Sequence, residues 1–401
     1  MLFILFGVQM GLLSCECRKE PSFVGEALEY CASNLEQSLE QLSPLDYTLS
    51  PRTIESGESE WRLLKAGKRM WTSGFWPGLL WYGYEASGDE KFFREARNYT
   101  DAIASIAEPP ASNHDIGFMV YCSNGNGYRL DAEKREQYKQ TLIEGAESLS
   151  TLYNPRVGTI LSWPGKSGVY GGHNTIIDNM VNLELLFWAA KESGEHSSLF
   201  DMAVSHADKT MQYCFRPDYS VYHVVVYDAQ SGEMLRAGVH PKNYEDSIWT
   251  RGQGWAIYGY TMCYRYTKYP RYMETAQRAA DALLERLPEN MIPYWDLADP
   301  SIPDAPYDSS AAAIVASALV ELSEYVGGDK GAHYLAVAES ILMELGRNFR
   351  SDDSPALLLH ATGNRLSGSE VDASIIYADY YYIEALLRLR SLYSTGQAVS
   401  N

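Results

Sequence analysis

Two aspartates in this 401-residue chain lie in local sequences that are suited to acid–base chemistry. Asp115 lies in the segment HDIGF (residues 114–118) and Asp178 in the segment NTIIDNM (174–180), and both have apolar neighbours. An apolar environment disfavours the charged form of a carboxylate, so its pKa rises and it can exchange a proton near neutral pH. A pair of such carboxylates suits acid–base chemistry on sugars.

The position of Asp178 argues against a purely structural role. The pattern places it in the first turn of an apolar helix, on one face with Val181, Leu185 and Trp188. An unpaired carboxylate in such a place is costly. For Asp115 a structural role stays open as the simpler alternative, because an aspartate at the start of a helix is commonly an N-cap.

Arg251 opens the segment RGQGW (251–255), which is predicted to begin a helix. Arg251 and Trp255 are four residues apart and share a helix face. A guanidinium can bind a carboxylate through two parallel hydrogen bonds, and an indole can stack on a sugar ring. This pair therefore fits an acidic sugar, and Arg251→Ala is expected to raise KM far more than it alters folding. The alternative is an arginine paired with a structural acid such as Asp246.

Three loop segments are predicted to bring aromatic or polar side chains close to Asp178. They are WTSGFWPG (71–78), SWPG (162–165) and GGHN (171–174), although each also fits ordinary turn chemistry. His223 lies in the apolar run VYHVVVY (221–227) and is either a site residue or a satisfied core histidine.

Charge and motifs exclude several classes of function. The net charge of −19 is unfavourable for binding nucleic acid or an anionic membrane surface, so an anionic substrate needs a local cationic site. No phosphate-binding loop, Ser/His/Asp order or HExxH motif stands out. Apart from Cys15, the cysteines have neither CxxC pairs nor metal-ligand spacing, which predicts no disulfide framework and no zinc site. We expect neither a metal nor an organic cofactor.

The N-terminus resembles a bacterial lipoprotein signal. Residues 1–14 are almost wholly apolar, and the segment LLSC ends at Cys15, which would carry the lipid. The stretch is too short to span a membrane and is followed by polar residues. The sequence thus predicts a signal and tether over 1–20 and one catalytic domain over 21–401. It also predicts an exported protein, a periplasmic or outer-membrane lipoprotein of a Gram-negative bacterium, whose only membrane contact is that anchor. The alternative is a buried N-terminal helix.

Helical periodicity recurs along the whole chain, and strand-like alternation is scarce. Short turns containing glycine or proline, such as those at 87–89, 193–195, 268–270 and 327–329, join helices into hairpins. This predicts an all-α, (α/α)6 barrel of six helical hairpins; an open solenoid is the alternative. Residues 216–244 are predicted to form a β-hairpin or flap at the active-site end. The twelve expected helices are 24–42, 74–87, 90–107, 116–123, 131–152, 175–193, 196–214, 249–267, 270–286, 309–326, 330–347 and 373–392.

Taken together, these segments resemble the unsaturated glucuronyl hydrolases of glycoside hydrolase family 88. The resemblance rests on residues 71–81, HDIGF, IIDNM, YH (222–223), RGQGW, DSSAA (308–312) and ADYY (378–381), in the same order over nearly the whole mature chain. The two aspartate segments together with RGQxW are the specific part.

The resemblance implies an (α/α)6 barrel that removes a 4,5-unsaturated uronic acid from the non-reducing end of oligosaccharides made by polysaccharide lyases, with glycosaminoglycan-type substrates expected. Asp178 would protonate C4 of the vinyl ether and activate water for C5, after which the hemiketal opens. Asp115 would stabilise the site and tune Asp178, because nearby like charges raise one pKa. The expected substrate-binding residues are Trp71, Trp76, His114, Trp163, Asn179, His223, Arg251 and Trp255.

One segment departs from the family pattern. Where many members have a Gln-Gly pair before RGQxW, this chain has HPKN (240–243), so His240 or Lys242 is either a contact for a sulfate or carboxylate or part of a solvated loop. Three other functions stay open: an unsaturated rhamnogalacturonyl hydrolase acting on pectin fragments, a non-catalytic glycan-binding lipoprotein, and an inverting endo-glycanase on the same barrel.

Overall fold

The chain folds into two concentric layers of helices with small sheets added. A computed structural model describes residues 20–42, 46–194, 198–238 and 246–394. The inner helices are α2 (Phe75–Ser87), α4 (Ile116–Val120), α5 (Asn126–Leu130), α8 (Asn179–Glu192), α10 (Thr250–Thr267), α12 (Ser309–Val326) and α14 (Ile376–Ser394). The outer helices are α1 (Ser22–Leu42), α3 (Glu90–Ala102), α6 (Arg135–Ser150), α9 (Ser198–Tyr213), α11 (Pro270–Leu284) and α13 (Gly328–Asn348).

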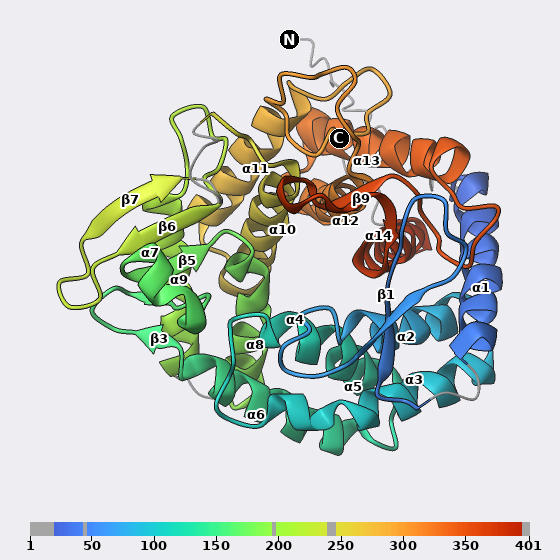
Figure 1. Cartoon of the computed structure of the whole chain (residues 1–401), viewed down its shortest axis with the longest axis horizontal. Helices are drawn as coiled ribbons and strands as arrows, with labels where there is room; N and C mark the ends of the chain where they lie inside the picture. The colour runs from blue at the N-terminus through green and yellow to red at the C-terminus, as the bar shows by residue number, and fades with distance from the viewer. Residues whose placement is uncertain (1–19, 43–45, 195–197, 239–245, 395–401) are drawn as a thin grey trace, which may run out of the picture.

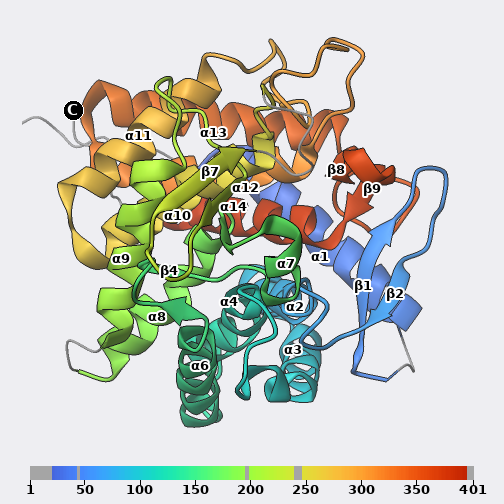
Figure 2. The same cartoon turned by 60° about the vertical axis from the view of Figure 1, so that its left-hand side comes forward.

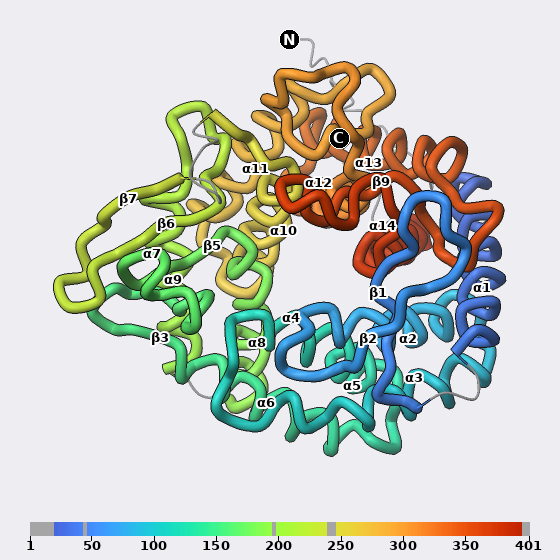
Figure 3. Tube along the Cα trace, in the orientation of Figure 1, coloured from blue at the N-terminus to red at the C-terminus, as the bar shows by residue number. Residues whose placement is uncertain are grey.

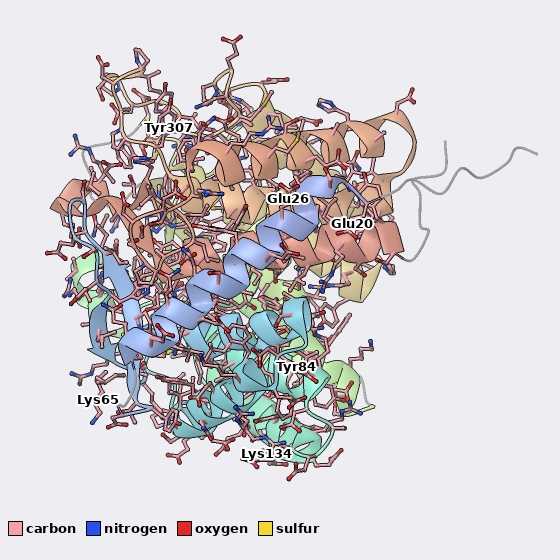
Figure 4. All side chains as sticks on the ribbon, turned by 90° about the vertical axis from the view of Figure 1, so that its right-hand side faces the viewer. Glu20, Glu26, Lys65, Tyr84, Lys134 and Tyr307 are labelled. Carbon is pink, nitrogen blue, oxygen red and sulfur yellow. The ribbon has the colours of Figure 1, made fainter. Side chains whose placement is uncertain are left out.

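The inner helices form a closed ring (Figure 1). Successive inner helices pack on one another, and the last, α14, packs on the first, α2. This closure excludes the open solenoid. Each inner element is joined to an outer helix that packs behind it, and α1 completes the outer layer against α2 and α14. Figure 4 shows α1 crossing obliquely over the outside of the molecule.

The two layers follow from two kinds of helical sequence. The inner helix α12 (SSAAAIVASALVELSEYV) is apolar on almost every side, and its first fifteen residues are buried. It is the one helix among the described residues with the length and hydropathy of a membrane span, and its burial among other helices explains that composition. The outer helix α3 is amphipathic and buries Phe92, Ala96 and Tyr99, which recur every three or four residues.

The hairpin turns have the caps that the sequence predicts. Gly88 ends α2 with a φ of 73°, and Asp89 caps α3 by accepting a hydrogen bond from the Lys91 N–H at 2.8 Å. Lys268 ends α10 in the left-handed region with a φ of 56°, and Pro270 is the first residue of α11.

A partly buried polar network holds the inner ring together towards the C-terminal ends of its helices. Arg388 donates to Glu321 at 2.8 Å, and Arg265 donates to Glu184 at 2.7 Å. The Tyr258 hydroxyl donates to Glu384 at 3.1 Å and accepts from Arg388 at 2.8 Å. These bonds join α8, α10, α12 and α14. Because the charges are paired, their burial is tolerated.

Three small sheets accompany the helices, so the chain is mostly helical but has more strands than the one β-hairpin that the sequence predicts. The first has the antiparallel order β2-β1-β9-β8, so it joins strands from both ends of the chain, which Figure 3 shows side by side. The second pairs β3 and β4, and the third has the order β5-β6-β7. The strands are β1 (Leu49–Ile54), β2 (Arg62–Lys65), β3 (Tyr153–Asn154), β4 (Thr159–Ile160), β5 (His173–Ile176), β6 (Val224–Tyr227), β7 (Met234–Gly238), β8 (Ala361–Asn364) and β9 (Ser369–Ile375).

The predicted hairpin within 216–244 is present as β6 and β7. Three predicted helices begin too early. β5 occupies the start of the 175–193 prediction and β9 the start of the 373–392 prediction, and residues 131–134 of the 131–152 prediction precede α6. In the first two cases, Thr175 and Ile176 pair with β6, and Ser374 and Ile375 pair with β1, instead of entering the helix. Figure 2 shows the β1–β2 and β8–β9 strands together on one side of the ring. The lipoprotein signal and the segment 240–243 lie outside the described residues.

The remaining short elements lie in the connections. The π-helix η2 (Tyr121–Gly125) joins α4 to α5, and α7 (Ser167–Tyr170) follows the 3₁₀ turn η3 (Pro164–Lys166). Two further 3₁₀ turns are η1 (Ala104–Ala107) and η4 (Arg365–Ser367).

Candidate active site

A cavity of about 640 Å³ lies where the inner helices begin. Its lining includes Asp115 and Asp178 at the starts of α4 and α8, Arg251 near the start of α10, and Tyr377 near the start of α14. The N-terminal end of a helix carries a partial positive charge, so helix ends that converge here favour an anionic ligand. The β8–β9 turn closes one side of the cavity.

Asp115 and Asp178 both occupy N-cap positions, but neither carboxylate caps its helix. Asp308 shows the contrast, because it accepts hydrogen bonds from the N–H groups of Ser310 and Ala311 and so caps α12. In Asp178 the buried Oδ2 atom has no hydrogen-bond partner among the described residues. A buried polar atom left unsatisfied by the fold calls for an explanation, and an acid–base role supplies one.

Both carboxyl groups hold protons more readily than an exposed aspartate. Burial raises the pKa of Asp115 to about 7, against the opposing charges of Arg52 and Lys166. Burial also raises the pKa of Asp178 to about 7, and the charge of Asp115 adds to this rise. Arg251 and the indole N–H of Trp255 oppose it. The sequence-based expectation of raised carboxylate pKa values thus has a physical basis in the structure.

His114 lies beside Asp115 and is itself fully buried. Burial lowers the pKa of His114 to about 3, so its ring is neutral. The Asn182 Oδ1 atom accepts a hydrogen bond from the Phe118 N–H at 2.6 Å, so the Asn182 Nδ2 group faces the His114 Nδ1 atom at 3.2 Å as a donor. The proton of His114 is therefore on Nε2, which lies 3.3 Å from Asp115 Oδ1.

Gly117, the glycine of HDIGF, is required because Asn182 packs directly against it. A Cβ atom on Gly117 would lie 2.4 Å from Asn182 Oδ1 and 2.6 Å from its Cα. We expect Gly117→Ala to move α4 and its Asp115, and to lower kcat/KM by about 10²-fold, as a displacement of about 1 Å can. Steady-state kinetics checks this. Gly25→Ala is the matched control, because nothing lies within 4 Å of the added methyl group. Wild-type activity in a folded Gly117→Ala protein would contradict this account.

Aromatic and cationic side chains follow one another around the cavity wall, with one histidine between two tryptophans. Each neighbouring pair is 4.4 to 5.9 Å apart, measured between ring centroids or from the cationic group to the ring. Rings that offer stacking faces and cations that offer charge together suit an acidic sugar. In order, this belt comprises Trp71, Arg52, Tyr377, Arg251, Trp249, His223, Trp163 and Lys166.

His223 lies beside the candidate acid. Its Nε2 atom is 3.9 Å from Asp178 Oδ2, and both side chains are 16% exposed. His223 is therefore open to the cavity and is not a closed core histidine. Its ring packs on Trp249 at 4.5 Å, which fixes its plane.

Arg251 lines the cavity but is held by buried partners. Its Nη1 atom donates to Asp308 Oδ2 at 2.6 Å and to the Thr362 carbonyl at 2.7 Å, and its Nη2 atom donates to the Gly363 carbonyl at 2.8 Å. A structural acid does pair with Arg251, but it is Asp308 and not Asp246, which is exposed.

Three residues expected to bind substrate do not line the cavity. Trp76 is fully buried and packs edge-on against Tyr99 at 5.8 Å. Asn179 is buried and donates to the Ile160 carbonyl at 3.2 Å, so it supports the loop before Trp163. Trp255 lies beneath the site, fully buried. Trp255 lies one helical turn beyond Arg251 on α10 and therefore deeper in the ring, where its indole packs in the core.

The site also contains residues that sequence reasoning missed. Trp249 and Tyr377 lie within two residues of segments that had been singled out, RGQGW and ADYY. Arg52 and Glu370 have no local signal, because strand pairing between distant parts of the chain brings them together.

The described residues include no group of three His, Cys, Asp or Glu side chains arranged to hold a metal. The four cysteines within the described ranges are buried and unpaired.

Comparisons with known proteins find relatives that are similar in sequence and in fold. The model of Glycosyl Hydrolase Family 88 matches residues 49–394. The chain is 43% identical over 355 residues to an unsaturated glucuronyl hydrolase of Formosa agariphila, covering 87% of this chain and 85% of that protein. It is 33% identical over 327 residues to an unsaturated chondroitin disaccharide hydrolase of Streptococcus pyogenes, covering 79% of this chain and 80% of that protein.

Solved structures agree with the sequence matches. The crystal structure of an unsaturated glucuronyl hydrolase specific for heparin matches with a TM-score of 0.84 at 38% identity, covering 92% of this chain and 97% of the other. The enzyme from Bacillus sp. GL1, responsible for the degradation of glycosaminoglycan, matches with a TM-score of 0.84 at 29% identity, covering 91% and 96%.

Proposed function

This chain belongs to glycoside hydrolase family 88, and we propose that its cavity removes the unsaturated uronic acid from glycosaminoglycan-derived oligosaccharides. It is an unsaturated glucuronyl hydrolase, a glycosidase that acts on the non-reducing end. The observation that carries this proposal is the pair of buried carboxyl groups, Asp115 and Asp178, inside a belt of aromatic and cationic side chains at the helix N-termini.

The proposed mechanism is hydration of the vinyl ether double bond. Protonated Asp178 gives its proton to C4, and the ionised carboxylate then takes a proton from the water that adds to C5. The product is a hemiketal, which opens and releases the remaining saccharide. Asp115 stays ionised in the working state, and its charge keeps the proton on Asp178. Arg251 and the helix N-termini supply the positive potential for the uronate carboxylate, and His223 offers it a hydrogen-bond donor.

The pH dependence follows from the coupled pair. Two neighbouring carboxyl groups titrate in two steps that belong to the pair. At low pH both are protonated and Asp178 lacks its negatively charged neighbour; at high pH both are ionised and no proton is available for C4. With both pKa values raised to about 7, we expect a bell-shaped profile of kcat/KM with an acidic to neutral optimum. A flat profile from about pH 4 to about 9 would contradict this assignment.

The decisive assay follows the ultraviolet absorbance of the conjugated double bond. The purified protein is mixed with unsaturated disaccharides from chondroitin, hyaluronan, heparin and pectin lyase digests. Decay on glycosaminoglycan products supports the proposal and ranks them. Decay on pectin products alone would favour the rhamnogalacturonyl hydrolase. An endo-glycanase would instead release reducing ends from intact polysaccharide, and binding without decay would favour the glycan-binding lipoprotein.

The fold and the location of the protein are part of the same proposal. The six pairs of inner and outer elements support an (α/α)6 barrel, with the β5–β6–β7 and β8–β9 insertions at the substrate end. The sequence around Cys15 supports a signal and tether over 1–20, followed by one domain and export as a lipoprotein. Membrane fractionation of the wild type and of Cys15→Ser tests the anchor. If Cys15 carries the lipid, the wild type should be found in the membrane fraction and the variant should not.

A further inference from the structure

Arg52 and Glu370 form a fork that joins two segments 318 residues apart. Arg52 Nε donates to Glu370 Oε1 at 2.7 Å, and Nη2 donates to Oε2 at 2.7 Å. The two side chains are only 12% and 10% exposed. Two parallel charge-assisted hydrogen bonds fix both distance and orientation, which a lysine in this position could not do.

The backbone at Arg52 is shaped to direct this side chain. The register between β1 and β2 shifts between Pro51 and Thr53, so Arg52 is the extra residue of a β-bulge. Bulges turn a side chain away from the regular alternation of a strand and are common beside active sites. The guanidinium lies 5.3 Å from the ring of Trp71 and 5.8 Å from the ring of Tyr377. Both rings line the cavity.

The backbone at Glu370 is shaped for the same contact. Glu370 has a φ of 54°, in the left-handed region that a non-glycine residue rarely adopts. Such conformations persist where the surroundings hold them and cluster at functional sites. Gly363 lies opposite, and a Cβ atom there would be 2.3 Å from Glu370 Oε2 and 2.7 Å from its Cβ. The missing side chain of Gly363 leaves room for the fork.

We propose that Arg52 is a positioning residue for the hydration reaction. Its fork with Glu370 holds the β8–β9 turn as one wall of the cavity, while its guanidinium holds Trp71 and Tyr377 at their spacing in the belt. The inference rests on the proposed function. Because the wall and the rings meet the substrate before and during the reaction, their loss should appear mainly as a higher KM.

Arg52 has a second, electrostatic effect that gives an independent readout. The charged or titratable groups that act on or face Asp115 are His114 beside it, Asp178 on α8, Lys166 on η3 and Arg52 on β1. The positive charge of Arg52 lowers the pKa of Asp115. Removing that charge raises the pKa of Asp115, so the acidic limb of the pH profile moves to higher pH.

The test compares three variants in the absorbance assay. In Arg52→Gln we expect KM to rise about tenfold or more with a smaller change in kcat, and the acidic limb to move to higher pH. Arg52→Lys keeps the charge but not the fork. Its acidic limb should therefore lie at the wild-type position, while its KM should be raised as in Arg52→Gln. Glu370→Gln should raise KM without moving the limb to higher pH. Arg94→Gln, on the exposed outer face of α3, is the matched control.

Two results would overturn the inference. One is a folded Arg52→Gln protein with wild-type KM and an unmoved acidic limb. The other is a loss of thermal stability in all three variants with unchanged kinetics below the unfolding transition. If Arg52→Gln does not fold, Arg52→Lys and Glu370→Gln decide by the KM rise that both should share. Failure of the proposed function is a separate outcome, because the wild-type protein would then show no decay.

Discussion

We expect Asp178→Asn to lower kcat by about 10²- to 10⁴-fold, the range that a positioned general acid and base contributes. Asparagine keeps the shape of the side chain but can neither give a proton to C4 nor take one from water. Substrate binding should persist, because the belt of rings and cations is unchanged. Single-turnover absorbance decay measures the loss of chemistry, and calorimetric titration with an unsaturated disaccharide measures the retained binding.

The same variant should be more stable than the wild type as the pH rises. The folded-state pKa of Asp178 is about 7, above the value of an unfolded aspartate. Such a group stabilises the fold fully at low pH, and that contribution is lost as the pH rises through about 7. Asparagine cannot ionise, so its advantage in the free energy of unfolding should be absent near pH 4 and appear by about pH 8.

Asp353→Asn is the matched control for both measurements, because Asp353 is exposed and does not line the cavity. We expect wild-type kinetics and no stability gain that depends on pH. If Asp178→Asn retains turnover while the control behaves as expected, another group must supply the proton.

The sequence predicts the helical part of this fold well, for identifiable reasons. Turn residues such as Gly88 and Pro270 mark helix ends through local conformational preference, which acts at the same place whatever the tertiary structure. Helical periodicity likewise depends on neighbouring residues. Small strands have no such local mark. The last three residues of β9 fall within the predicted helix 373–392, because the pairing of β9 with β1 depends on residues more than 300 positions away.

The same distinction between local sequence signals and tertiary structure applies to the residues of the site. Asp115 and Asp178 can be found because a carboxylate in an apolar sequence is unusual wherever it occurs. Whether it caps its helix cannot be read from sequence, and only the structure distinguishes these two from Asp308. Trp255 shows the opposite case, because the structure places it below the cavity and not in its wall. Sharing a face with Arg251 predicts the correct direction along α10 but not how far the cavity extends.

Arg251 illustrates how burial changes an expected phenotype. From the sequence, Arg251→Ala should raise KM with little effect on folding. In the structure the guanidinium is the cationic partner of Asp308, whose side chain is fully buried, and it also binds two carbonyl groups of β8. Removing one member of a buried ion pair leaves a charge without compensation. We therefore expect Arg251→Met to lower the free energy of unfolding by about 3 to 5 kcal/mol.

Denaturant unfolding of four proteins tests this expectation. Arg251→Met combined with Asp308→Asn should recover at least about 1 kcal/mol relative to Arg251→Met alone, because the buried charge is gone and asparagine still caps α12. Arg278→Met is the matched control, since Arg278 is 52% exposed and its ion pair with Glu274 spans one helical turn. Its effect should stay within about 1 kcal/mol. If Arg251→Met is as stable as this control, Arg251 is free to act mainly on substrate, and the KM effect expected from the sequence should dominate.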